Sequence, residues 1–232
     1  MIELYFWPTP NGHKASIMLE ETGLEYETHP VNILKGDQFE PRFLAISPNN
    51  RIPAIVDTDG PGGEAFSLFE SGAILMYLAD KADMLWPRDT AARYRVTQWL
   101  MFQMGNVGPK FGECGHYKGY APEPVPYSED RYHKELLRLY GVMDQRLGEN
   151  AYLADDYSIA DIAVFPWMAP KVRELHQVDI HTFPNVARWY QRIDARPAVQ
   201  RGMALLEDQM KIGDPDDAAR EAFFGDSQFK KL

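Results

Sequence analysis

Two polar side chains that can stabilise negative charge, Thr9 and Asn11, occur in the run Pro8-Thr9-Pro10-Asn11-Gly12. The prolines interrupt a strand pattern and a helical pattern follows, so both side chains are expected near a helix N-terminus. A hydroxyl, an amide and the helix dipole could together hold a thiolate there. Making a thiol mostly thiolate at pH 7 takes about 2.7 kcal/mol, and one hydrogen bond to a charged group contributes about 1.5–3 kcal/mol. The alternative is that Thr9 and Asn11 are ordinary turn residues.

Any such thiol would have to arrive with a ligand, because the first eighty residues contain no cysteine. The single cysteine, Cys114, lies in Gly112-Glu113-Cys114-Gly115-His116. A catalytic role would require a lowered pKa of its thiol, and we favour a buried or partly exposed free thiol. One cysteine also excludes an intramolecular disulfide and a zinc site built on cysteines. The six histidines show no metal-ligand spacing, so no metal is predicted.

A second chemical group is formed by Glu70 and Ser71, which precede a helical pattern. A carboxylate can bind an ammonium group, and the N–H groups at a helix N-terminus can bind a carboxylate. Ser71 is the candidate N-cap of this helix. The alternative is that the pair only caps the helix.

Pro53 is unusual because it stands inside the alternating pattern that begins at Ile52. Proline cannot donate to a strand ladder, so either a cis bond or an edge-strand position is needed to explain it.

Changes in hydrophobic period predict the elements that hold these residues. In the first half, the predicted order is βαβαββα. Its members are strands near residues 2–6, 26–33, 52–56 and 66–69 and helices from about Gly12 to Gly23, over 39–46 and from Ser71 onward.

The second half shows no further strand pattern and predicts helices only. They are expected from Arg88 to about Gly112 with a disturbance near Gly105, Gly108 and Pro109, from Pro126 through Leu147, after the capping box Ser158-Ile159-Ala160-Asp161, and after Phe183-Pro184. Arg196-Pro197 is expected to open the last helix, and the polar segment from about Gly213 to Leu232 is predicted to be a partly ordered tail.

Composition excludes several classes of protein. The 232 residues carry 24 Lys+Arg against 34 Asp+Glu, a formal charge of −10, which disfavours nucleic-acid binding. The longest apolar run, Ala73 to Ala79, is far shorter than the ~20 residues that span a bilayer. No signal-peptide pattern follows Met1, and we expect a cytoplasmic protein without membrane contact.

The predicted order of elements and three separated motifs resemble the cytosolic glutathione S-transferases over residues 1 to about 210. The motifs at residues 8–14, 47–53 and 69–74 are similar to those of the bacterial Nu class, a group similar to a yeast nitrogen regulator. The resemblance implies an α/β thioredoxin-like domain over 1–84, an all-α domain over 88–211 and a tail over 212–232. It also implies a homodimer that joins through its third and fourth helices, with Phe69 and Met104 as candidate contacts.

Glutathione is the ligand that this resemblance implies, as a co-substrate rather than a bound cofactor. Glu70 and Ser71 would then hold the ammonium and carboxylate of its γ-glutamyl end. A cis Pro53 would leave the backbone of Ile52 to pair with the cysteinyl part. Gln38 and Arg51 would reach the glycine end, and Arg131 matches a family position that contacts the ligand. Thr9 and Asn11 would stabilise the thiolate of glutathione.

Nu-class transferases reduce disulfides with glutathione, so the resemblance favours this reaction, with two glutathiones or one glutathione disulfide in a site. A small disulfide or electrophile would be the second substrate. Tyr117, Tyr120, Phe165 and Trp167 are candidates for its pocket. Two alternatives are conventional conjugation or peroxidase activity and a glutathione-binding regulatory module without turnover.

Overall fold

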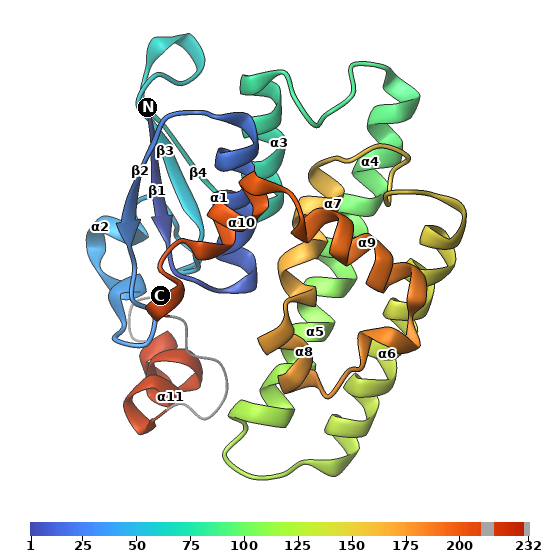
Figure 1. Cartoon of the computed structure of the whole chain (residues 1–232). Helices are drawn as coiled ribbons and strands as arrows, with labels where there is room; N and C mark the ends of the chain where they lie inside the picture. Colours follow the sequence, from blue (N-terminus) through green and yellow to red (C-terminus); the bar gives the residue numbers. More distant parts are fainter. Residues whose placement is uncertain (210–215, 230–232) are drawn as a thin grey trace.

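The computed structural model describes residues 1–209 and 216–229. A sheet with its helices forms the N-terminal half, and a bundle of helices forms the other half (Figure 1). The predicted order βαβαββα is confirmed. The elements of this half are β1 (Ile2–Phe6), α1 (Pro10–Thr22), β2 (Tyr26–Pro30), α2 (Pro41–Leu44), β3 (Ala54–Asp57), β4 (Phe66–Phe69) and α3 (Ser71–Ala82).

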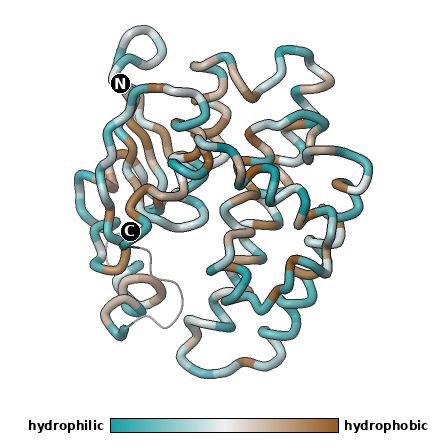
Figure 2. Tube along the Cα trace, viewed as in Figure 1, coloured by the Kyte–Doolittle hydropathy of each residue, from teal (hydrophilic) through white to brown (hydrophobic). Residues whose placement is uncertain are grey.

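The four strands pair in the order β2-β1-β3-β4. β2 runs parallel to β1, whereas β3 runs antiparallel to both β1 and β4. The alternating residues Ile2, Leu4 and Phe6 are buried, as the strand pattern predicts. Figure 2 shows the apolar residues concentrated along these strands.

The second half is helical, and its elements are α4 (Thr90–Phe102), α5 (Gly108–Gly115), α6 (Pro126–Glu149), α7 (Ile159–Val164), α8 (Pro170–His176), α9 (Pro184–Asp194), α10 (Pro197–Ala204) and α11 (Asp217–Phe224). The predicted disturbance is a π-helical segment, Gln103–Val107, between α4 and α5. Pro109 is the second residue of α5, and its missing N–H cannot complete an ordinary helical ladder at this point. The capping box of Ser158 and Asp161 forms at the start of α7.

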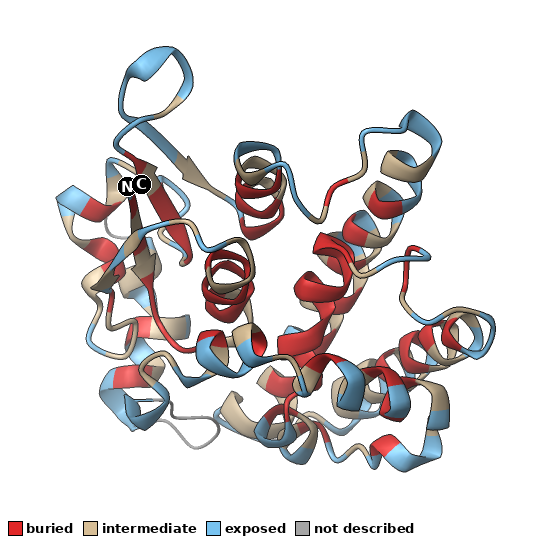
Figure 3. Cartoon of the chain, turned by 45° about the horizontal axis from the view of Figure 1, so that its top comes forward, coloured by how far each residue is buried: buried red, intermediate tan, exposed pale blue. Residues whose placement is uncertain are grey.

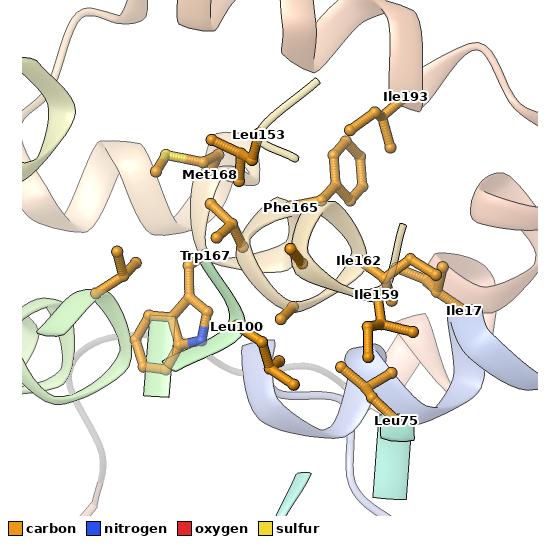
Figure 4. Packing of buried hydrophobic residues seen from close by; sticks show 14 of the residues in the cluster. Ile17, Leu75, Leu100, Leu153, Ile159, Ile162, Phe165, Trp167, Met168 and Ile193 are labelled. Atoms are coloured by element: carbon orange, nitrogen blue, oxygen red, sulfur yellow. The ribbon is translucent and has the colours of Figure 1, made fainter. Parts of the chain in front are cut away.

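One continuous apolar core joins the two halves. In Figure 4, Ile17 of α1 and Leu75 of α3 lie against Ile159 and Ile162 of α7. Figure 3 shows the same arrangement as buried helix faces turned toward the middle of the molecule and exposed faces outside. A second, smaller cluster of Val31, Phe43 and Ala54 lies within the N-terminal half. The division of the chain into domains at residues 84–88 stays a prediction.

Helix α10 returns from the helical half to pack on α1. A Cβ atom at Gly202 would lie 2.6 Å from the Cα atom of Ile17, so only glycine permits this approach. The Ser16 hydroxyl donates to the Gly202 carbonyl oxygen at 2.7 Å. The returning helix therefore fixes α1, which carries Thr9 and Asn11 at its start.

The structure corrects several expected elements. α10 is not the last helix, because α11 follows within the segment predicted as a tail, and α8 was not predicted. Residues 212–215 and 230–232 of that tail lie outside the described residues. Glu70 rather than Ser71 is the N-cap of α3, and β2 ends at Pro30, three residues before the predicted end of the strand. No described helix is long and apolar enough to span a membrane.

Candidate active site

A cleft between the two halves contains two adjoining chambers of about 320 and 360 Å³. Asn11, Arg51, Ile52, Gly112 and Trp167 line both of them. The first chamber also contains Thr9 and Gln38, and the second contains Pro53, Glu70 and Ser71. The structure thus brings together every predicted site residue except Arg131.

Thr9 is the N-cap of α1, which begins at Pro10 rather than near Gly12. Its Oγ1 accepts from the Gly12 amide at 3.2 Å, so its own O–H remains available as a donor toward the chamber. Asn11 lies in the first turn beside it. The N-terminus of α1 therefore presents donors and a positive dipole end to the cleft.

The Ile52-Pro53 peptide bond is cis, the first of the two explanations that the sequence left open and the one that the resemblance implied. β3 begins after it at Ala54, so Ile52 lies outside the strand and lines both chambers. The Ser47 hydroxyl donates to the carbonyl oxygen of Arg51 at 2.8 Å and holds the preceding loop. The edge-strand alternative for Pro53 does not apply, because Pro53 precedes the strand.

Glu70 and Ser71 lie where β4 turns into α3. Glu70 has φ 71°, a left-handed conformation that is costly for a residue other than glycine. Ser71 is the first residue of α3 and is buried. A carboxylate and the amides of a helix N-terminus thus meet at one wall of the second chamber.

Lys14 is a site residue that sequence reasoning missed. Its side chain is 1% exposed, and it lines the second chamber. Nζ donates to Ser71 Oγ at 3.1 Å and to Gln103 Oε1 at 2.8 Å. Burial lowers the pKa of Lys14 to about 7, opposed by the nearby Glu70 carboxylate. The signal in the sequence is its position four residues before the core residue Met18, which places a cation on the buried face of α1.

The C-terminal segment accepts hydrogen bonds from two of the residues that were predicted to bind the ligand. Arg51 Nη1 donates to Gln228 Oε1 at 2.9 Å, and Gln38 Nε2 donates to the Ala222 carbonyl oxygen at 3.3 Å. Phe223 and Phe224 line the first chamber. The polar tail gave no sequence signal for this role apart from its isolated phenylalanines.

Arg131 lies on α6, where Nη1 is 3.7 Å from a carboxylate oxygen of Glu135. It lines neither chamber of this chain, and its contact with the ligand stays a prediction.

Two of the four residues predicted for the second-substrate pocket line a chamber. Tyr120 lines the first chamber and Trp167 lines both. Tyr117 instead stacks on Tyr132, and Phe165 stacks on Tyr190 in the core. Of the four predicted pocket residues, only Tyr120 and Trp167 therefore lie at the wall of a described chamber.

The Cys114 thiol is fully buried, and burial raises its pKa to about 11. It is therefore a poor nucleophile near neutral pH. Over residues 1–209 and 216–229, no cluster of three or more potential metal ligands occurs.

Comparison with known proteins identifies relatives along most of the chain. Models of the glutathione S-transferase N-terminal and C-terminal domains match residues 1–80 and 121–197. Disulfide-bond oxidoreductase YfcG of Escherichia coli is 48% identical over 212 residues, which cover 90% of this chain and 97% of YfcG.

Solved structures show the same fold. A glutathione transferase of Pseudomonas putida, with one glutathione disulfide bound per subunit, has a TM-score of 0.84 at 47% identity, covering 88% of this chain and 91% of its own. A family member from Pseudomonas fluorescens, with two glutathione bound, has a TM-score of 0.83 at 49% identity, covering 87% and 92%.

Proposed function

The chain belongs to the glutathione S-transferase family, and from this premise we propose that it uses glutathione to reduce small disulfides. The observation that carries the proposal is that the groups able to stabilise a thiolate line the cleft, whereas the cysteine of the chain does not. The one cysteine is buried away from the cleft with a raised pKa, whereas Thr9, Asn11 and the α1 N-terminus face the cleft. The nucleophilic sulfur is therefore supplied by the ligand.

In the proposed site, Glu70 and Ser71 bind the γ-glutamyl end of glutathione and Ile52 pairs with its cysteinyl backbone. Gln38 and Arg51 receive the glycine end, and Arg131 contributes a further contact. This orientation directs the sulfur of glutathione toward Thr9 and Asn11. The Thr9 hydroxyl and the Asn11 amide donate to the thiolate, which lowers the pKa of the thiol.

The proposed reaction consists of two exchanges. A glutathione thiolate attacks one sulfur of the disulfide, forms a new S–S bond and expels the other sulfur as a thiolate. A second glutathione thiolate attacks the glutathione sulfur of this mixed disulfide, which releases glutathione disulfide and a second thiolate. The two protons lost by the glutathiones end on the two product thiols. Two adjoining chambers support this proposal, as do relatives solved with two glutathione or with glutathione disulfide.

Glutathione conjugation is a second candidate, favoured by the aromatic wall of the first chamber. An apolar electrophile could bind against the aromatic side chains of this wall, which are Trp7, Phe111, Tyr120, Trp167, Phe223 and Phe224. The motifs at residues 8–14, 47–53 and 69–74 support assignment to the Nu class, in which disulfide reduction is expected to dominate.

The test is turnover of 2-hydroxyethyl disulfide with glutathione, coupled through glutathione reductase to NADPH oxidation. Thr9→Val and Asn11→Ala should each lower kcat/KM roughly 10- to 100-fold, because each removes a hydrogen bond to a charged sulfur. Cys114→Ser is the matched control and should retain activity. Loss of turnover in Cys114→Ser with full activity in both other variants would contradict the proposal.

A further inference from the structure

Lys14 is a buried cation without a buried anion as its partner. The two oxygen atoms that accept from its ammonium group, Ser71 Oγ and Gln103 Oε1, are both neutral. An isolated charge in a protein interior is costly unless it is paired. The described residues form no ion pair with Lys14, so its charge is left for something that enters the chamber.

Gln103 is a second unsatisfied group on the same wall. It is fully buried in the π-helical segment, and its Nε2 has no hydrogen-bond partner among the described residues. Because its Oε1 accepts from Lys14, the amide is oriented with its N–H groups as the remaining donors. Buried donors of this kind are rarely left unpaired in a folded protein.

Ser71 connects these groups to the N-terminus of α3. Its hydroxyl oxygen accepts from Lys14, so its proton is left to donate, and its described acceptor is the weakly accepting Met104 sulfur at 3.7 Å. Glu70 lines the same chamber. The wall thus offers a carboxylate beside a buried ammonium, a hydroxyl and a helix N-terminus.

We propose that Lys14 is the buried cation that selects the α-carboxylate of an amino-acid zwitterion at this wall. This inference rests on the proposed function and deepens it. Glu70 takes the ligand's ammonium group, and Ser71 donates to its α-carboxylate. Lys14 acts through Ser71 as a positioning residue and neutralises the carboxylate charge. The γ-glutamyl end of glutathione is a ligand of this class.

Binding then couples to the protonation of Lys14. Burial lowers the pKa of Lys14 to about 7, and a carboxylate placed beside it raises the pKa. Of the groups that face Lys14, Glu70 at the start of α3 is ionisable, whereas Ser71, Gln103 and Met104 are not. His13, its neighbour on α1, points to the Gly202 carbonyl oxygen instead. Ligand binding should therefore take up a proton above pH 7, and affinity should fall as pH rises.

The experiment is isothermal titration calorimetry of the full chain with S-methylglutathione, which carries no titratable thiol. Titrations at pH 6.5 and 8.5 in buffers of different ionisation enthalpy measure the protons taken up. A second ligand, S-methylated γ-aminobutyryl-cysteinyl-glycine, keeps the amine and lacks the α-carboxylate. Lys14→Met removes the charge, and Lys171→Met is the matched exposed-lysine control.

The wild type should take up protons with S-methylglutathione at pH 8.5 and none with the analogue. Lys14→Met should abolish this uptake and weaken S-methylglutathione roughly 10- to 100-fold at pH 6.5, while its affinity for the analogue stays within about twofold of the wild type. The comparison of the two ligands uses the wild-type protein alone, so it tests the inference even if Lys14→Met does not fold. Equal proton uptake with both ligands, or unchanged affinity in Lys14→Met, would overturn the inference alone. No binding of S-methylglutathione to the wild type would overturn the proposed function as well.

Discussion

At the scale of single residues, burial decides which side chains can react. Burial favours the neutral form of both Cys114 and Lys14, raising the pKa of the thiol and lowering that of the ammonium group. Cys114 lies in the core and lines neither chamber, so it stays inert. Lys14 lines a chamber, where an anion can restore its charge. The same physical effect therefore gives one side chain a structural role and the other a binding role.

Asp161 is a buried carboxylate whose role is structural. It accepts from the Leu153 amide at 3.0 Å, the Ser158 amide at 3.1 Å and Trp189 Nε1 at 2.8 Å. Asp161→Ala leaves these buried donors without an acceptor. We expect it to lower the free energy of unfolding by roughly 3 kcal/mol or more, measured by urea unfolding at pH 7. The exposed Asp156→Ala should change it by less than about 0.5 kcal/mol, and equal effects would contradict this role.

The Asp161 carboxyl also gives stability a pH dependence of definite sign. Burial raises its pKa to about 6 in the folded protein, above the ~3.9 of an unfolded aspartate. The contribution of this group to stability is therefore fully present below about pH 4 and is lost as pH rises through 6. Asp161→Asn should remove this component from urea-unfolding profiles between pH 4 and 7, and an unchanged profile would contradict the assignment.

At the scale of elements, the C-terminal segment forms part of the wall of the first chamber. α11 lies beyond both matched family models, which end at residues 80 and 197, and beside the N-terminal half in Figure 1. Ala222 of α11 accepts from Gln38, and Gln228, which lies beyond the helix, accepts from Arg51. Gln38 and Arg51 are the residues proposed to bind the glycine carboxylate of glutathione. In the proposed site, glutathione would therefore compete with the C-terminal segment for the same donors.

Two substitutions at Gln228 test this competition. Both remove the hydrogen bond from Gln228 Nε2 to the Ala222 carbonyl oxygen, so their difference isolates the contact with Arg51. Gln228→Ala should tighten glutathione binding roughly two- to fivefold, whereas Gln228→Glu adds a charge pair with Arg51 and should weaken it. The measurement is the dissociation constant of glutathione for the wild type and each variant, determined by calorimetry. Weaker binding by Gln228→Ala would mean that the tail supports the ligand instead.

At the scale of the whole molecule, α4 presents a face that suits association. Tyr94 is 68% exposed and Met101 is 47% exposed, and their spacing of seven residues places both on one side of the helix. Exposed large apolar side chains on one face favour an interface. Of the earlier candidates, Met104 instead packs toward Lys14 and Ser71 inside the chamber.

We expect a homodimer that uses this face of α4. Light scattering after size exclusion should give twice the chain mass of 26.6 kDa. Met101→Arg should produce monomers, because it places an unpaired charge in an apolar contact. Tyr127→Arg, on α6 and 79% exposed, should leave the dimer intact. A monomeric wild type would contradict the prediction.

The sequence alone determined the local structure and pointed to several residues of the candidate site. Alternation of Ile2, Leu4 and Phe6 and the capping box at Ser158 depend on neighbours along the chain, and both formed as predicted. Thr9, Pro53 and Ser71 were recognised because prolines and helix starts mark such positions. These signals depend on residues that are close together in the sequence, so they can be recognised without the tertiary structure.

Only the tertiary structure decided the surroundings of Lys14 and the position of α11. Lys14 meets Ser71 and Gln103 from elements 57 and 89 residues away, and Gln38 meets Ala222 from 184 residues away. Burial, and with it the shifted pKa of a lysine or a thiol, depends on what packs around the group in three dimensions. No spacing along the chain encodes that packing, because it arises only when the two halves close on a common core.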